Sequence, residues 1–128
     1  MQLDEYFLTQ KGWGVLSTAN ARGAVDAALY TAPFVMDEHT IAFIMADKLT
    51  HRNLQENPHA VYVFVEEGRE ISGKRLYLKK TAEYTDQALI DNLRKRKAEW
   101  PVSQECDSEQ RFLVYFQVDF DRPLVGGD

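Results

Sequence analysis

The chain alternates between short apolar runs and polar turns, and this pattern predicts six β-strands. In residues 59–65, valines occupy one face of the expected strand and aromatic residues the other. The run IAFIMA within residues 40–46 is apolar throughout, which predicts a strand buried on both faces. The six predicted strands cover residues 13–18, 24–36, 40–46, 59–65, 74–84 and 112–120.

Three short helices are predicted around these strands. One lies within the first ten residues, where apolar positions recur at helical spacing. The second covers residues 49–57, with Thr50 as its expected N-cap and Pro58 as its stop. The third covers residues 87–100 and is capped by Asp86. Most connections between the strands are too short for crossover helices, so we expect antiparallel pairing in a mainly β, α+β fold built on a small barrel.

Composition places the chain among ordinary folded domains. Its 128 residues are 45% hydrophobic and 27% charged, which predicts a single domain over residues 1–128. No apolar run reaches the roughly 20 residues of a membrane-spanning helix. The net charge of −5 disfavours nucleic acid as a partner. The start of the chain lacks a basic, signal-like region and Cys106 is the single cysteine, so we expect a cytoplasmic protein without an internal disulfide or a multi-cysteine metal site.

The junction between the third strand and the second helix carries the most informative chemistry. Lys48 and Thr50 stand where a buried strand ends and a helix begins. A helix N-terminus offers unpaired N–H groups and the positive end of the helix dipole, so an added ammonium and hydroxyl would form a phosphate site. The alternative is a capped helix with solvated charges, which these residues alone slightly favour.

Two further segments carry weaker signals. Residues 29–33 end a strand at Thr-Ala-Pro, where free backbone groups could bind a flat heterocycle, although a simple bend at Pro33 is the favoured interpretation. On the fifth strand, Arg75, Tyr77 and Lys79 share one face that could meet an anionic ligand. A solvated outer face explains Lys79 better than it explains Arg75.

Motifs of classical catalysis and metal binding do not occur in the sequence. His39, His51 and His59 lack any metal-ligand spacing, and Cys106 lies in a polar stretch with no activating motif. We therefore predict no catalytic side chain and no metal site.

A long stretch of the chain resembles a known family. The residues GVLSTANARGAVDAALYTAPFVMDEHTIAFIMADKLTHRNLQENPHAVYVF, followed by the weaker RLYLKKTAEYTD, resemble the pyridoxamine 5′-phosphate oxidase-like FMN-binding split barrels, and HRNLQENPHAVYVF is the most specific part. The size resembles the short FMN-binding proteins of this family. The resemblance implies a six-stranded antiparallel split β-barrel with short flanking helices. It also implies an FMN-dependent oxidoreductase whose flavin lies at a homodimer interface and exchanges electrons with a small molecule.

The resemblance assigns three parts of an FMN site. Residues 48–50 match positions that grip the phosphate, supported by Asn53. Residues 30–32 match the strand that lines the isoalloxazine ring, and residues 44–45 match the strand before the phosphate loop. Arg75 matches a polar position that reaches the flavin, and the partner-side contacts fall within residues 100–120. The matched cofactor-binding residues are Tyr30, Thr31, Ala32, Ile44, Met45, Lys48, Leu49, Thr50, Asn53 and Arg75.

The sequence also departs from the family pattern. Leu49-Thr50 stands where the oxidases proper have an Arg-Lys pair, and their longer substrate-binding C-terminal segment has no counterpart here, which disfavours vitamin B6 oxidation. Three alternatives stay open. Deazaflavin F420 could use the cations at positions 74, 75, 79 and 80 for its acidic tail. Haem could use His51 or His59 as an axial ligand, and a cofactor-free binding module would need neither.

Overall fold

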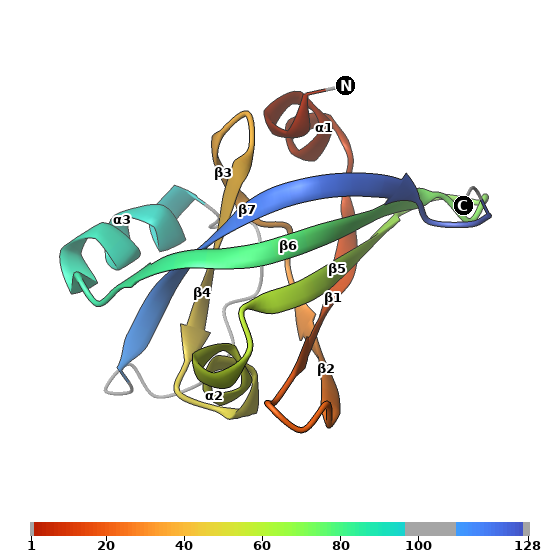
Figure 1. Cartoon of the computed structure of the whole chain (residues 1–128). Helices are drawn as coiled ribbons and strands as arrows, with labels where there is room; N and C mark the ends of the chain where they lie inside the picture. Colours follow the sequence, from red (N-terminus) through yellow and green to blue (C-terminus); the bar gives the residue numbers. More distant parts are fainter. Residues whose placement is uncertain (1, 97–109, 127–128) are drawn as a thin grey trace.

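The computed structural model describes residues 2–96 and 110–126, which form seven strands and three helices around one main core (Figure 1). No helix in these two segments is long and apolar enough to cross a membrane. The elements in chain order are α1 (Leu3–Thr9), β1 (Gly12–Ala19), β2 (Val25–Tyr30), β3 (Phe34–Asp37), β4 (Thr40–Ala46), α2 (Leu49–Glu56), β5 (His59–Glu66), β6 (Gly73–Tyr84), α3 (Gln87–Arg96) and β7 (Arg111–Pro123).

All seven strands belong to one antiparallel sheet in the order β2-β1-β5-β6-β7-β4-β3. The prediction of a mainly β, antiparallel fold is confirmed. The prediction of six strands is wrong, because the sheet has seven. The predicted split barrel is not closed here, since the two edge strands, β2 and β3, do not pair within the described residues. The sheet curves strongly around its core but stays open (Figure 1).

The extra strand arises where residues 24–36 were expected to be continuous. The structure divides them at residues 31–33 into β2, which pairs with β1, and β3, which pairs with β4. Pro33 has no N–H to give to a ladder, so the chain leaves one edge of the sheet there and joins the other. The favoured prediction of a bend at this proline is therefore confirmed.

Alternation along the strands builds the main core on the concave side of the sheet. Inward positions of β1, β4, β5, β6 and β7 meet there, and α1 and α2 each add apolar side chains. The fully buried aromatic rings are those of Tyr62, Phe64 and Phe116. The other buried members are Leu3, Tyr6, Leu16, Ile41, Phe43, Met45, Leu54, Ala60, Leu76, Leu78 and Val114.

A second, smaller cluster lies on the other side of β4 and β7, where α3 covers them. Ile90 and Leu93 of α3 pack with Ala42 and Leu113, and Ile44 lies against this cluster. The prediction that β4 is buried on both faces is confirmed. The cap of α3 is also as predicted, since an Asp86 carboxylate oxygen accepts hydrogen bonds from the first-turn amides at 3.0 and 3.2 Å.

A tyrosine of the interior strand β5 holds the crossing from β2 to β3. The Tyr62 hydroxyl lies 3.0 Å from the carbonyl oxygens of both Tyr30 and Thr31 and donates to them. Gly14 makes room for this ring, because a side chain at position 14 would collide with it. Burial raises the pKa of the Tyr62 phenol, so the hydroxyl keeps the proton that it donates.

Tyr62→Phe tests this tether, the pair of hydrogen bonds from the Tyr62 hydroxyl to the carbonyls of Tyr30 and Thr31. It leaves the ring in place and removes the hydroxyl that donates to the two carbonyls, so the free energy of unfolding should fall by about 1–2 kcal/mol. Urea denaturation measures the loss. Tyr84→Phe, at an exposed position, is the matched control and should cost well under half as much. Equal losses in the two variants would contradict the tether.

Candidate functional site

The candidate site is centred on the turn where β4 leads into α2. Lys48 occupies the N-cap position in an extended conformation, with φ −124° and ψ −166°, and the helix starts at Leu49. The prediction of Thr50 as the N-cap is therefore wrong by two positions. Thr50 lies inside the first helical turn and is only 5% exposed, because the chain turns into the helix directly after Asp47 and carries this side chain inward.

The electrostatics of this turn favour an anion. The N-cap side chain makes no capping hydrogen bond and the first turn contains no acidic residue. The first amides of a helix have no partner within it, so they present N–H groups at the positive end of the helix dipole. The side chains of Lys48 and Leu49 are exposed beside them. An ammonium and several amides in one turn form a donor set that suits a phosphate.

One anchor of α2 joins it to β1. Asn53 is 3% exposed, and its amide nitrogen donates to the Thr18 hydroxyl at 3.1 Å. Thr18 is itself buried at the end of β1, and Leu54 of α2 packs into the main core next to this pair. The role of Asn53 in this structure is therefore to fix the helix on the sheet.

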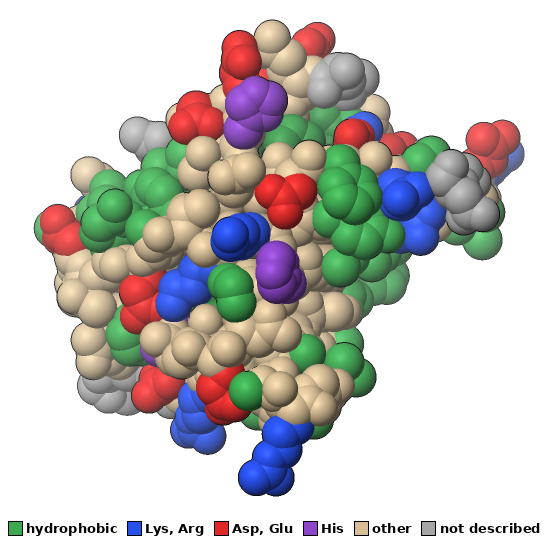
Figure 2. Space-filling view, in the orientation of Figure 1, with side chains coloured by type: hydrophobic (Ala, Val, Ile, Leu, Met, Phe, Trp, Pro, Cys, Tyr) green, Lys and Arg blue, Asp and Glu red, His purple; other side chains and the backbone are tan. Residues whose placement is uncertain are grey.

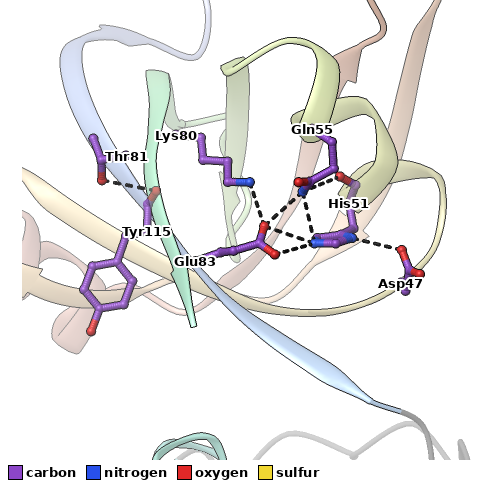
Figure 3. Close-up of polar contacts among 7 residues, drawn as sticks. All are labelled: Asp47, His51, Gln55, Lys80, Thr81, Glu83 and Tyr115. Atoms are coloured by element: carbon purple, nitrogen blue, oxygen red, sulfur yellow. Dashed lines mark hydrogen bonds and ion pairs between the residues drawn. The ribbon is translucent and has the colours of Figure 1, made fainter. Parts of the chain in front are cut away.

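The other anchor joins α2 to the far end of β6 through His51 (Figure 3). The Nδ1 atom of His51 lies 2.9 Å from an Asp47 carboxylate oxygen, and Nε2 lies 3.1 Å from both Glu83 carboxylate oxygens. The Gln55 amide nitrogen is 3.1 Å from the same Nε2 and donates to Glu83 at 2.9 Å. The ammonium of Lys80 completes the network 2.6 Å from Glu83.

Glu83 is the electrostatic centre of this network. Burial alone would raise its pKa, but hydrogen bonds from Lys80, Gln55 and His51 outweigh burial and lower the pKa to about 2. The carboxylate is therefore ionised throughout the physiological range. Because its ordinary pKa is 4.5, it contributes stability that is fully present above that pH and is lost as the pH falls toward 2.

The segment predicted to lie along a flavin ring sits against the main core. The Tyr30 ring meets Phe43 edge-on at 5.6 Å, and Ala32 packs on the same cluster. Thr31 is exposed between them, with its carbonyl bound by Tyr62. Met45 is 2% exposed within this core.

Arg75 lies apart from α2. It stands near the start of β6, opposite Val63, whereas α2 leads into the other end of β5. Its guanidinium donates to the carbonyl oxygens of Pro123 and Gly126 at 2.9 and 3.1 Å. In this structure Arg75 therefore holds the segment that follows β7.

The convex face of the sheet is largely apolar over β2, β1 and β5. Cross-strand pairing aligns Leu29, Val15, Val63 and Arg75 in one row, and Leu29 is 74% exposed. The adjacent row ends in Tyr77 and Phe120, whose rings stack at 4.5 Å. Figure 2 shows hydrophobic surface over the parts of β6 and β7 nearer the C-terminus, beside a mixed region containing lysine or arginine, acidic and histidine side chains.

A hollow of about 380 Å³ opens on this convex face. Its walls come from β1, β2, β5, β6 and β7 and are mostly apolar. The polar side chains on its wall include Ser17, His59 and Asp119, with Tyr77 and Phe120 along one side. No cluster of three potential metal-ligating side chains occurs in the described part of the chain.

The predicted residues thus fall into four places. Residues 48–50 and Asn53 come together on α2, and residues 30–32 and Met45 come together on the main core. Ile44 lies beneath α3, and Arg75 lies on the convex face. The predicted partner-side segment is only partly described, since residues 97–109, including Trp100 and Cys106, lie outside the described residues.

The sequence analysis missed the network around His51. It considered His51 only as a candidate haem ligand at a helix start, whereas the structure makes it one of the most enclosed polar residues described, at 6% exposed. The four-residue spacing of Asp47 and His51 is a signal that could have paired them. Nothing local points to Glu83, which is 32 positions further along the chain.

Comparisons with known proteins extend this description. The family model described as pyridoxamine 5′-phosphate oxidase matches residues 4–119. A crystal structure of an FMN-binding protein from Syntrophomonas wolfei superposes with a TM-score of 0.77 at 18% identity, covering 99% of this chain and 86% of that one. A search of curated proteins found no match.

Two other solved structures have the same fold. An F420 reductase superposes with a TM-score of 0.72 at 16% identity, covering 91% of this chain and 94% of that one. HupZ of Group A Streptococcus gives a TM-score of 0.70 at 16% identity, with coverage of 98% and 93%. Since the family model spans nearly all of the described strands and helices, the chain belongs to the pyridoxamine 5′-phosphate oxidase family.

Proposed function

We propose that this protein is a flavoprotein that binds FMN without a covalent bond at the interface of a homodimer and acts as an oxidoreductase. The observation that carries the proposal is the N-terminal turn of α2, which combines an uncapped, acid-free helix start with Lys48. The family match and the similarity to an FMN-binding protein support FMN as the ligand. The proposal treats residues 1–128 as one domain, and the single cysteine supports a cytoplasmic location.

The α2 turn would hold the FMN phosphate. Backbone amides of residues 49–51 and the Lys48 ammonium supply N–H donors and positive charge, which a phosphate dianion requires. Thr50 and Asn53 are buried, so they would hold the turn in position by packing and would not touch the phosphate. Bound FMN would supply the redox chemistry, so the chain needs no general base or nucleophile of its own.

Residues 30–32 would line the isoalloxazine ring, and Ile44 and Met45 belong to β4, the strand that leads into the proposed phosphate turn. Tyr62 already holds the carbonyls of Tyr30 and Thr31, so the segment keeps one conformation whether or not a ligand is present. A fixed backbone edge of this kind lowers the entropic cost of binding a flat, rigid ring.

The convex face supports a homodimer. Leu29, Trp13 and Val25 are 74%, 52% and 82% exposed on β2 and β1. Exposed apolar side chains in such number on neighbouring strands are typical of an interface, and a second copy would cover them by two-fold symmetry. Arg75 stands in the same cross-strand row as Leu29 and would reach the partner's flavin across this interface.

Some residues expected to bind the two alternative cofactors have other partners in the structure. Two of the four cations expected to meet the acidic tail of F420 are in salt bridges within the chain: Lys74 with Asp121 and Lys80 with Glu83. Both ring nitrogens of His51 have polar partners, which disfavours it as a haem ligand. His59, the other candidate haem ligand, is exposed on the wall of the convex hollow, so the preference for FMN rests on the α2 turn.

Lys48→Ala tests the phosphate site. Loss of one charge-assisted contact should weaken FMN binding about 10- to 100-fold, while thermal unfolding without ligand stays unchanged because the side chain is exposed. Titration of FMN followed by flavin fluorescence measures the affinity. Lys11→Ala, at another exposed lysine, is the control and should bind as the unaltered chain does. Unchanged affinity in Lys48→Ala would place the phosphate elsewhere.

Leu29→Asp tests the dimer. The unaltered protein should sediment at twice the chain mass of 14.7 kDa, and a carboxylate in the middle of the apolar row should convert it to monomers. Ile71→Asp is a close control, because Ile71 is 77% exposed in the loop between β5 and β6. Analytical ultracentrifugation distinguishes the two. A monomeric unaltered protein, or dissociation by both substitutions alike, would refute the proposed interface.

A further inference from the structure

We infer that His51 is a positioning residue for the phosphate group of FMN, acting by locking the first turn of α2 onto the end of β6. This inference rests on the proposed function, since it assigns a task to a residue behind the proposed phosphate site. His51 immediately follows Thr50, so any movement of its ring moves the amides that would bind the phosphate.

The contacts of His51 fix the ring on every side. Its two nitrogens face Asp47 at 2.9 Å and Glu83 at 3.1 Å (Figure 3). Its plane stacks on Phe112 of β7 at 3.9 Å and 15°. Gln55, one turn further along α2, bridges the ring and Glu83. A buried ring held by polar partners at both nitrogens and by a stack has one orientation available. It therefore transmits the position of β6 and β7 to the α2 turn.

Charge gives the network a second consequence for the same site. Asp47 directly precedes Lys48, and a free carboxylate there would repel a phosphate dianion. Instead Asp47 is turned onto His51, and Glu83 is compensated by Lys80, Gln55 and His51. The network thus keeps two carboxylates beside an anion site while directing them to partners of their own.

The two anchors of the proposed flavin site are separate. The segment for the isoalloxazine ring is held by Tyr62, and the α2 turn is held by His51. Loss of the His51 contacts should therefore weaken binding of FMN much more than binding of riboflavin, which has the same ring system without the phosphate. A merely structural role would weaken both ligands alike.

His51→Phe is the test variant, because phenylalanine keeps the stack on Phe112 and removes both nitrogens. We expect the FMN dissociation constant to rise about tenfold or more and that of riboflavin to change less than about twofold. Fluorescence titrations with FMN and with riboflavin give both constants. His39→Phe makes the same substitution at an exposed histidine in the β3–β4 turn and should leave both constants unchanged.

Glu83→Gln provides a second route if His51→Phe does not fold. It keeps the shape of the side chain and removes the charge that the network is built around, so it should produce the same selective loss of FMN affinity. Circular dichroism verifies the fold of each variant. Equal losses for FMN and riboflavin, or no loss for FMN in a folded variant, would overturn the inference. An unaltered protein that binds neither flavin would overturn the proposed function itself, and this inference with it.

Discussion

The hydrogen bonds from the Tyr62 hydroxyl to the carbonyls of Tyr30 and Thr31 constrain the whole architecture. The chain must pass from one edge of the sheet to the other between β2 and β3, and this passage has no ladder to hold it. Tyr62 reaches it from β5 through the space that Gly14 leaves open. A buried phenol with its proton in place thus substitutes for the strand pairing that a closed barrel would provide.

The candidate site follows from that arrangement, because α2 fills the space at the end of β4 between the two halves of the sheet. Asn53 ties the helix to β1 on one side, and His51 ties it to β6 on the other. An eight-residue helix has little stability of its own, so these buried contacts and the packing of Leu54 decide its position. The orientation of the first turn of α2 is therefore set by the buried contacts of His51, Asn53 and Leu54.

Local pattern was sufficient to predict most of the strands, the short helices and the residues at the start of α2. The apolar run of residues 40–46 correctly indicated a strand covered on both faces, because no soluble strand leaves so many apolar side chains exposed. The division of residues 24–36 was missed, since their apolar content continues across Pro33. Closure of the barrel could not be judged either, because it depends on pairing between distant edges and no local signal encodes that.

The candidate site shows the same limit at the level of single residues. Lys48 and Thr50 could be selected because a helix start is a local event, whereas the partner of His51 is 32 positions away. The His51 network missed by the sequence analysis is important because Leu49-Thr50 stands where, by the resemblance, relatives have an Arg-Lys pair. With fewer cations available to a phosphate, the repulsion from nearby carboxylates matters more. In the proposed phosphate site, the network that directs Asp47 and Glu83 to His51 and Lys80 would reduce this repulsion without touching the phosphate.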